Sequence, residues 1–187
     1  MKRALPILIF LALIFVADDT LGQKMHSSWL DFESDRLGIN SFGMGLLISW
    51  ASVNILTGIP GWIFGKGTTR YFFQMNVFWN LVNLGLGLAG YLGAANADIS
   101  LLTQGEITSA YHDMQNLYIM NAGLDVAYIS IAFLLLERAK RILKWRHLLR
   151  GYGFSLIVQG GFLLIFDLIM FFVHKSHATQ YLYLIIS

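Results

Sequence analysis

The chain has 187 residues, of which 56% are hydrophobic and only 13% are charged, and its net charge is +2. A soluble domain carries about 25% charged residues, so this composition argues against a soluble globular protein and for lipid as the solvent. The absence of cysteine excludes a thiol relay, a disulfide framework and a cysteine-ligated metal. We expect no cofactor and no metal, and we expect the lipid bilayer rather than nucleic acid as the partner.

The N-terminal residues have the pattern of an export signal. A basic start over residues 1–3 precedes an apolar run over residues 4–17, which is shorter than the roughly 20 residues that a membrane span needs. Two aspartates end that run, and small residues before Gln23 permit cleavage there. We therefore predict a signal peptide over residues 1–22 and a membrane domain over residues 23–187. An uncleaved anchor helix is the alternative.

Four apolar segments follow, each close to the length that crosses about 30 Å of hydrocarbon as a helix. They cover about residues 39–64, 72–95, 117–136 and 154–173. Helices are the expected form, because backbone groups in lipid must find hydrogen bonds within their own segment. The predicted fold class is all-α, an integral membrane four-helix bundle preceded by a signal peptide.

Basic residues are concentrated in two of the connecting segments. Residues 65–71 and 137–150 together hold eight basic residues and a single acid, Glu137. The positive-inside rule places these two segments in the cytoplasm. We therefore predict a multi-pass protein of the inner (cytoplasmic) membrane, with the mature N-terminus and the C-terminus outside the cytoplasm.

The first two predicted spans share the pattern W-x-x-V-N-x-x-x-G-x-x-G, which begins at Trp50 and again, 29 residues later, at Trp79. Since these spans run in opposite directions, a true repeat would relate them by a pseudo-two-fold axis in the membrane plane. The asparagines, Asn54 and Asn83, need hydrogen bonds in the bilayer, and the glycines allow close helix approach. Two interpretations stay open: the motif packs helices together, or its asparagines line a polar cavity.

Two carboxylates lie within the last two spans, Asp125 in the third and Asp167 in the fourth. A charge at the membrane centre costs at least about 2.5 kcal/mol, so such residues face the bundle interior. Helical spacing places Asn121 and Tyr128 on the face of Asp125, and Gln159 on the face of Asp167. At about 1.5 Å per residue both carboxylates lie about 10 Å below the outer surface. We expect them to meet and to share a proton or bind a cation, or else to form a structural pair held by neighbouring amides.

Three motifs carry a resemblance to a known group of proteins. They are N-A-G-L-D-V-A-Y over residues 121–128, Q-G-G-F-L-L-I-F-D over residues 159–167 and M-N-x-x-W-x-x-x-N over residues 75–83. With these motifs the chain resembles an uncharacterised family of small bacterial four-span membrane proteins over about residues 40–175. The resemblance implies a bacterial membrane protein and carries no known activity.

The function that we predict is an uncharacterised inner-membrane protein with an outward-facing polar site for a proton, a cation or a small polar solute. The candidate residues are Asp125, Asp167, Asn121, Gln159, Tyr128, Asn54 and Asn83. The alternative is a non-catalytic structural or assembly subunit, with a second copy of the chain or another membrane subunit as its partner. An enzyme is less favoured, because the sequence shows no nucleophile–base pair.

Overall fold

The computed structural model describes the backbone of residues 5–186 and the side chains of residues 28–181. Its long helices are α1 (Leu5–Phe64), α2 (Gly67–Ala95), α3 (Gln104–Arg141) and α4 (Arg146–Ile186), and a turn of 3-10 helix, η1 (Leu143–Trp145), precedes α4. This confirms the all-α class for the described backbone. The predicted signal peptide, residues 1–22, lies outside the residues whose side chains are described.

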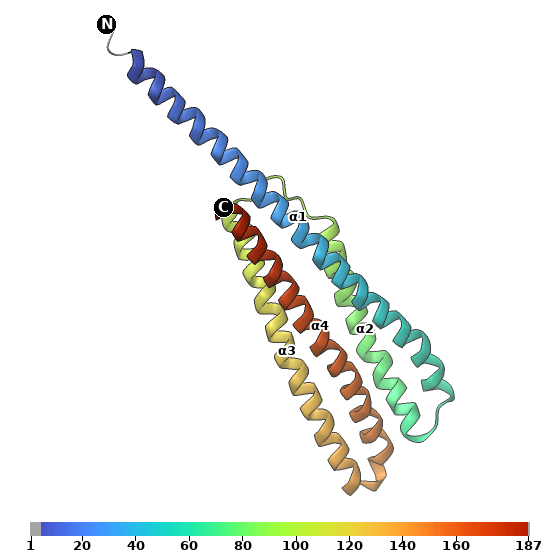
Figure 1. Ribbon diagram of the computed structural model, residues 1–187. Coiled ribbons are helices and arrows are strands. Elements are labelled where there is room, and N and C mark those ends of the chain that lie inside the picture. Colours follow the sequence, from blue (N-terminus) through green and yellow to red (C-terminus); the bar gives the residue numbers. More distant parts are fainter. Residues whose placement is uncertain (1–4, 187) are drawn as a thin grey trace.

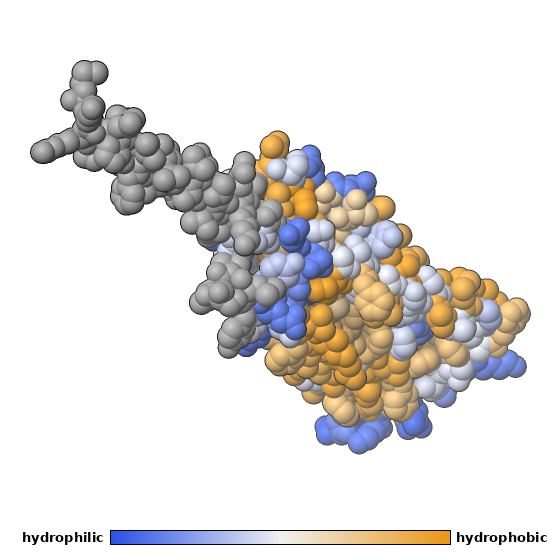
Figure 2. All heavy atoms as spheres, turned by 45° about the horizontal axis from the view of Figure 1, so that its top comes forward, coloured by the Kyte–Doolittle hydropathy of each residue, from blue (hydrophilic) through white to orange (hydrophobic). Residues whose placement is uncertain are grey.

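All four helices are long and apolar enough to cross a membrane, within Ser28–Phe64, Gly67–Ala95, Gln104–Arg141 and Leu143–Tyr181. Large apolar side chains cover the outer surface, where Phe42 and Leu56 are each 72% exposed. Lipid tolerates so much exposed apolar surface and water does not. Figure 2 shows this apolar surface between hydrophilic residues toward the two ends of the molecule.

The helices extend past the four apolar segments. Helix α3 already begins at Gln104, because Thr103 and Glu106 form a capping box: the Glu106 amide donates to Thr103 Oγ1 at 3.3 Å, and the Thr103 amide donates to Glu106 Oε2 at 2.8 Å. The basic segment 137–150 is also largely helical. Hydropathy marks only the part of each helix that is most apolar, and capping decides where the helix begins.

The chain forms two helical hairpins, α1–α2 and α3–α4, which lie side by side (Figure 1). Helix α2 packs against α4 and joins the hairpins, whereas α1 approaches α3 and α4 less closely. Residues 65–66 and 142–145 connect the helices at one end, which we call the basic end because eight basic residues gather there. Residues 96–103 connect α2 to α3 at the opposite end, which we call the far end.

The two copies of the repeated motif pack against each other reciprocally. A Cβ atom added at Gly58 of α1 would lie 2.7 Å from Val77 Cγ2 of α2. A Cβ atom added at Gly87 of α2 would lie 2.9 Å from Ile48 Cγ1 of α1. Both glycines are therefore needed for the close approach of the two helices.

The second glycine of each copy repeats the arrangement. A Cβ atom at Gly61 would overlap the ring of Phe73, and one at Gly90 would lie 2.7 Å from the sulfur of Met44. In each case the glycine and its partner are both displaced by the same 29 residues between the two copies. The packing therefore follows a pseudo-two-fold relation between α1 and α2, and the glycines of the motif serve helix packing.

Candidate functional site in the bundle interior

Asp125 of α3 and Asp167 of α4 meet inside the bundle, and their carboxyl groups interact directly. Only 3% of Asp125 and 5% of Asp167 is exposed. The two helices approach closely there: a Cβ atom added at Gly160 would lie 3.0 Å from Ile129 and 3.4 Å from the carbonyl oxygen of Asp125. The side-chain amide of Asn121, one turn before Asp125, lies next to Asp167. The predicted carboxyl pair is thus present, with one of its predicted amide partners.

The carboxyl pair lacks a compensating positive charge. None of the ion pairs among the residues with described side chains includes Asp125 or Asp167. Among the described residues, no donor forms a hydrogen bond with Oδ2 of Asp125. Two ionised carboxylates in contact repel each other strongly where water is excluded, whereas a single shared proton turns one oxygen into a donor. The geometry therefore suits a pair that carries one proton.

A second group, which we call the amide cluster, consists of Trp50, Asn54, Asn76 and Gln159 and joins α1, α2 and α4. Asn76 Nδ2 donates to Asn54 Oδ1 at 2.9 Å, and Trp50 Nε1 donates to Gln159 Oε1 at 2.9 Å. Gln159 Nε2 donates to Asn76 Oδ1 and, at 3.4 Å, to Asn54 Oδ1. On α4, Gln159 lies two turns nearer the basic end than Asp167. The amide cluster is therefore nearer the basic end than the carboxyl pair.

The last two predicted site residues, Tyr128 and Asn83, are placed differently. The ring of Tyr128 meets Trp79 of α2 edge-on, with centroids 4.6 Å apart and an interplanar angle of 82°. Asn83 is 4% exposed. Its Nδ2 atom has no hydrogen-bond partner among the side chains described, as is also true of Oδ1 of Asn80 and Oγ of Ser155. Sequence reasoning selected Asn83 but missed Asn80, which lies one turn before it on the same face.

A buried ion pair near the far end was also missed. Arg36 Nε and Nη2 bind the two carboxylate oxygens of Glu33 at 2.6 and 2.5 Å, and the residues are 4% and 3% exposed. The first apolar segment was predicted to begin at residue 39, so both residues fell outside it. Their spacing of three residues on a helix is the signal that identifies such a pair.

His174 and Tyr118 lie between this ion pair and the carboxyl pair. His174 directly follows the predicted fourth span, residues 154–173, but α4 continues past it. The residue is 1% exposed, and its ring is stacked 5.7 Å from that of Tyr118. Tyr118 donates to Asn40 Oδ1 at 3.1 Å. Both Arg36 and Asp167 act electrostatically on Tyr118. The buried position of His174 follows from the length of α4, which extends to Ile186.

Polar pairs also occur toward the basic end, where Tyr152 donates to Gln74 at 3.1 Å and Thr68 lies 3.0 Å from His147 Nδ1. Polar groups therefore recur along the bundle from Thr68 to Arg36. Among the described side chains, no three metal-ligating groups lie close enough together to hold a metal ion. One groove lies between α3 and α4 at the basic end and another lies beside Trp62, so both are away from the carboxyl pair.

The sequence model of a family of unknown function, DUF6992, matches residues 46–168, about two thirds of the chain. No curated protein and no solved structure matches the chain. The matched segment contains the carboxyl pair and the whole amide cluster, whereas Arg36 and His174 lie outside it. The match confirms the resemblance to an uncharacterised family.

Proposed function

We propose that the chain, which belongs to the DUF6992 family, is an integral membrane protein that binds and releases a proton at the paired carboxyl groups of Asp125 and Asp167. The single observation that carries this proposal is the direct contact of two buried carboxyl groups that have no cationic partner among the described side chains. Ionisable residues inside a membrane bundle are costly and are retained mainly for function.

The orientation follows from the distribution of charge. Eight basic residues at the basic end favour the cytoplasmic side of a bacterial inner membrane for that end, and the far end then faces outward. Within their apolar segments, residues 117–136 and 154–173, Asp125 and Asp167 both lie in the half that is nearer the far end. The proton site is therefore reached more easily from outside the cytoplasm.

Polar groups on both sides of the carboxyl pair support passage of the proton. Tyr118 and His174 lie toward the far end, and the amide cluster lies toward the basic end. Buried atoms of Asn80, Asn83 and Ser155 have hydrogen-bonding capacity that the described side chains do not use. A buried water makes about three hydrogen bonds to such groups, so a hydrated proton path fits this interior.

A structural role is the second candidate, and the amide cluster favours it. Its four side chains satisfy one another across three helices, as interhelical hydrogen bonds in membrane bundles do, at about 0.6 kcal/mol each. In this case the chain would be an assembly subunit that binds a second copy of itself or another membrane protein. The carboxyl pair would then hold α3 to α4 and would move no proton.

Proton transfer across vesicle membranes distinguishes the two candidates. The full chain is reconstituted in vesicles that contain a pH-sensitive dye, and an external pH step is applied. We expect the internal pH to relax faster than in empty vesicles for the wild type, and as slowly as in empty vesicles for Asp125→Asn and Asp167→Asn. Asp113→Asn is the matched control, because it removes an exposed carboxylate from the same helix and should behave like the wild type.

Two further measurements make the result decisive. Thermal unfolding of each variant shows whether lost transfer reflects a lost fold, and Asp167→Glu, which keeps a carboxyl group, should retain part of the transfer. Sodium- and potassium-sensitive dyes in the same vesicles test whether a cation replaces the proton. If folded wild-type protein transfers neither protons nor these cations, the structural role stands instead.

A further inference from the structure

The basic end contains a groove that the proposed proton site does not use. The groove lies between the end of α3 and the start of α4 and has a volume of about 700 Å³, which falls within the roughly 300–1,000 Å³ of ligand pockets. Its lining combines two kinds of side chain. They are Phe133, Leu136, Ala139 and Phe154 on the apolar side, and Glu137, Lys140, Arg146 and Arg150 on the polar side.

The charge of the groove is positive, and two of its cations lack an acidic partner. Glu137 is already paired with Lys140 at 2.7 Å and with Arg141 at 3.6 Å. No ion pair among the described residues includes Arg146 or Arg150, which lie four residues apart on one face of α4. Two guanidinium groups on one face can bind the oxygens of a single phosphate bidentately.

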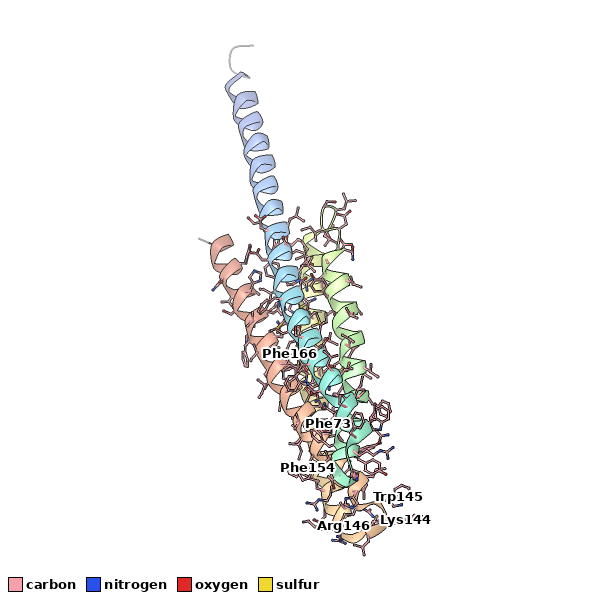
Figure 3. All side chains as sticks on the ribbon, turned by 90° about the vertical axis from the view of Figure 1, so that its right-hand side faces the viewer. Phe73, Lys144, Trp145, Arg146, Phe154 and Phe166 are labelled. Carbon is pink, nitrogen blue, oxygen red and sulfur yellow. The ribbon has the colours of Figure 1, made fainter. Side chains whose placement is uncertain are left out.

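The apolar lining continues from the cations toward the hydrophobic part of the bundle. The guanidinium of Arg150 lies 6.0 Å from the ring of Phe154, which is 42% exposed, and Phe133 across the groove is 60% exposed. Figure 3 shows Arg146 at the basic end and Phe154 further along α4. The groove is therefore cationic at the basic end and apolar further into the bundle. A phospholipid has the same order, with its charged phosphate at the membrane surface and its acyl chains below it.

We propose that this groove binds an anionic phospholipid, with its phosphate on Arg146 and Arg150 and its acyl chains along Phe133 and Phe154. The location supports a lipid rather than a soluble anion, because the groove opens where α3 and α4 leave the apolar part of the bundle. Trp145 is 50% exposed, and the ammonium of Lys144 lies 5.6 Å from its ring centroid. An exposed tryptophan of this kind anchors a helix end at the level of the lipid headgroups. Basic pockets between helices on the cytoplasmic side are suited to anionic headgroups.

The test uses native mass spectrometry of the full chain in detergent, with phosphatidylglycerol or phosphatidylcholine added at equal concentrations. The wild type should retain one phosphatidylglycerol in preference to phosphatidylcholine. Arg146→Gln and Arg150→Gln should each weaken phosphatidylglycerol binding about fivefold, which corresponds to about 1 kcal/mol per basic residue at an anionic surface. Arg138→Gln is the matched control, since it removes an exposed charge at the same end that does not line the groove.

Three outcomes would overturn the proposal. Equal losses in Arg138→Gln and Arg146→Gln would mean diffuse attraction to surface charge. Equal retention of phosphatidylglycerol and phosphatidylcholine by the wild type would mean that the groove does not select a negative headgroup. Displacement of phosphatidylglycerol by glycerol phosphate at similar concentration would mean that the site takes a soluble anion. Phe154→Ala, which keeps both arginines, should weaken lipid binding without changing the preference for the anionic headgroup.

Discussion

Replacing Gly61 by alanine tests the reciprocal packing of α1 and α2. The added methyl group would overlap the ring of Phe73 of α2, which is half-buried. Overpacking of this kind costs about 1–3 kcal/mol. Alanine also favours a helix over glycine by up to about 1 kcal/mol, which opposes part of that cost.

Gly85→Ala is the matched control, because it measures the gain in helix propensity from glycine to alanine without any overlap. A Cβ atom at Gly85 would meet no other atom within 4 Å, so this variant should gain only the helix-propensity term. The difference between the two variants then measures the overlap alone, and we expect Gly61→Ala to be less stable than Gly85→Ala by about 1–3 kcal/mol. Phe73→Leu in the Gly61→Ala background should recover part of the loss, because a smaller side chain leaves room for the methyl group.

The assay is equilibrium unfolding of the full chain in mixed micelles with increasing denaturing detergent, followed by tryptophan fluorescence. Gly90→Ala should cost less than Gly61→Ala, because its neighbour is the flexible thioether of Met44 at 2.7 Å. If Gly61→Ala is as stable as Gly85→Ala, or if Phe73→Leu rescues nothing, the helices do not pack at the glycines as described.

Three further predictions concern polar contacts. Gln159→Leu should cost about 1–3 kcal/mol of unfolding free energy and change the Trp50 fluorescence, because it leaves the indole N–H without its acceptor; an unchanged midpoint and spectrum would exclude this hydrogen bond. Arg36→Met should cost about 3–5 kcal/mol, and the double variant with Glu33→Gln should cost less, because only the single variant leaves a buried charge alone; equal losses would contradict a buried pair. Thr103→Ala should lose about 0.5–2 kcal/mol and speed amide exchange in the first turn of α3 only, and uniform exchange changes along α3 would argue against a local cap.

The sequence was sufficient to predict the carboxyl pair. Polar residues inside apolar segments must face the bundle interior, and the depths of Asp125 and Asp167 could be estimated from helix rise alone. Their contact in the structure agrees with that estimate. The relation between the first two spans was also visible, because the repeated motif and its glycines lie at a constant offset.

The partners of the asparagines were harder to predict, because they depend on the register between helices. The repeat suggested that Asn54 and Asn83 play matching roles, yet Asn54 bonds to Asn76 and Gln159 while Asn83 has an unpaired Nδ2 atom. The glycine contacts set the α1–α2 register, and α4 packs more closely against α2 than against α1. A sequence pattern shows which face a residue occupies but not which neighbour that face meets.

The residues missed near the far end have a different cause. The predicted apolar segments begin at residue 39 and end at residue 173, so Glu33, Arg36 and His174 lay just outside them. In the structure α1 and α4 continue and pack beyond their most apolar segments, and the charges of Glu33 and Arg36 are buried together. Mutual compensation between two charges is a tertiary property that a window over single residues does not detect.

Infrared spectroscopy of the folded chain in lipid detects the proposed shared proton itself, because a protonated carboxyl group has a C=O stretching band that an ionised one lacks. We predict that the wild type at neutral pH shows the band of one protonated carboxyl group per chain. Asp125→Asn and Asp167→Asn should each alter or remove this band, and Asp113→Asn should leave it unchanged. A wild-type spectrum without the band, or a band that stays the same in both pair variants, would contradict a shared proton at Asp125 and Asp167.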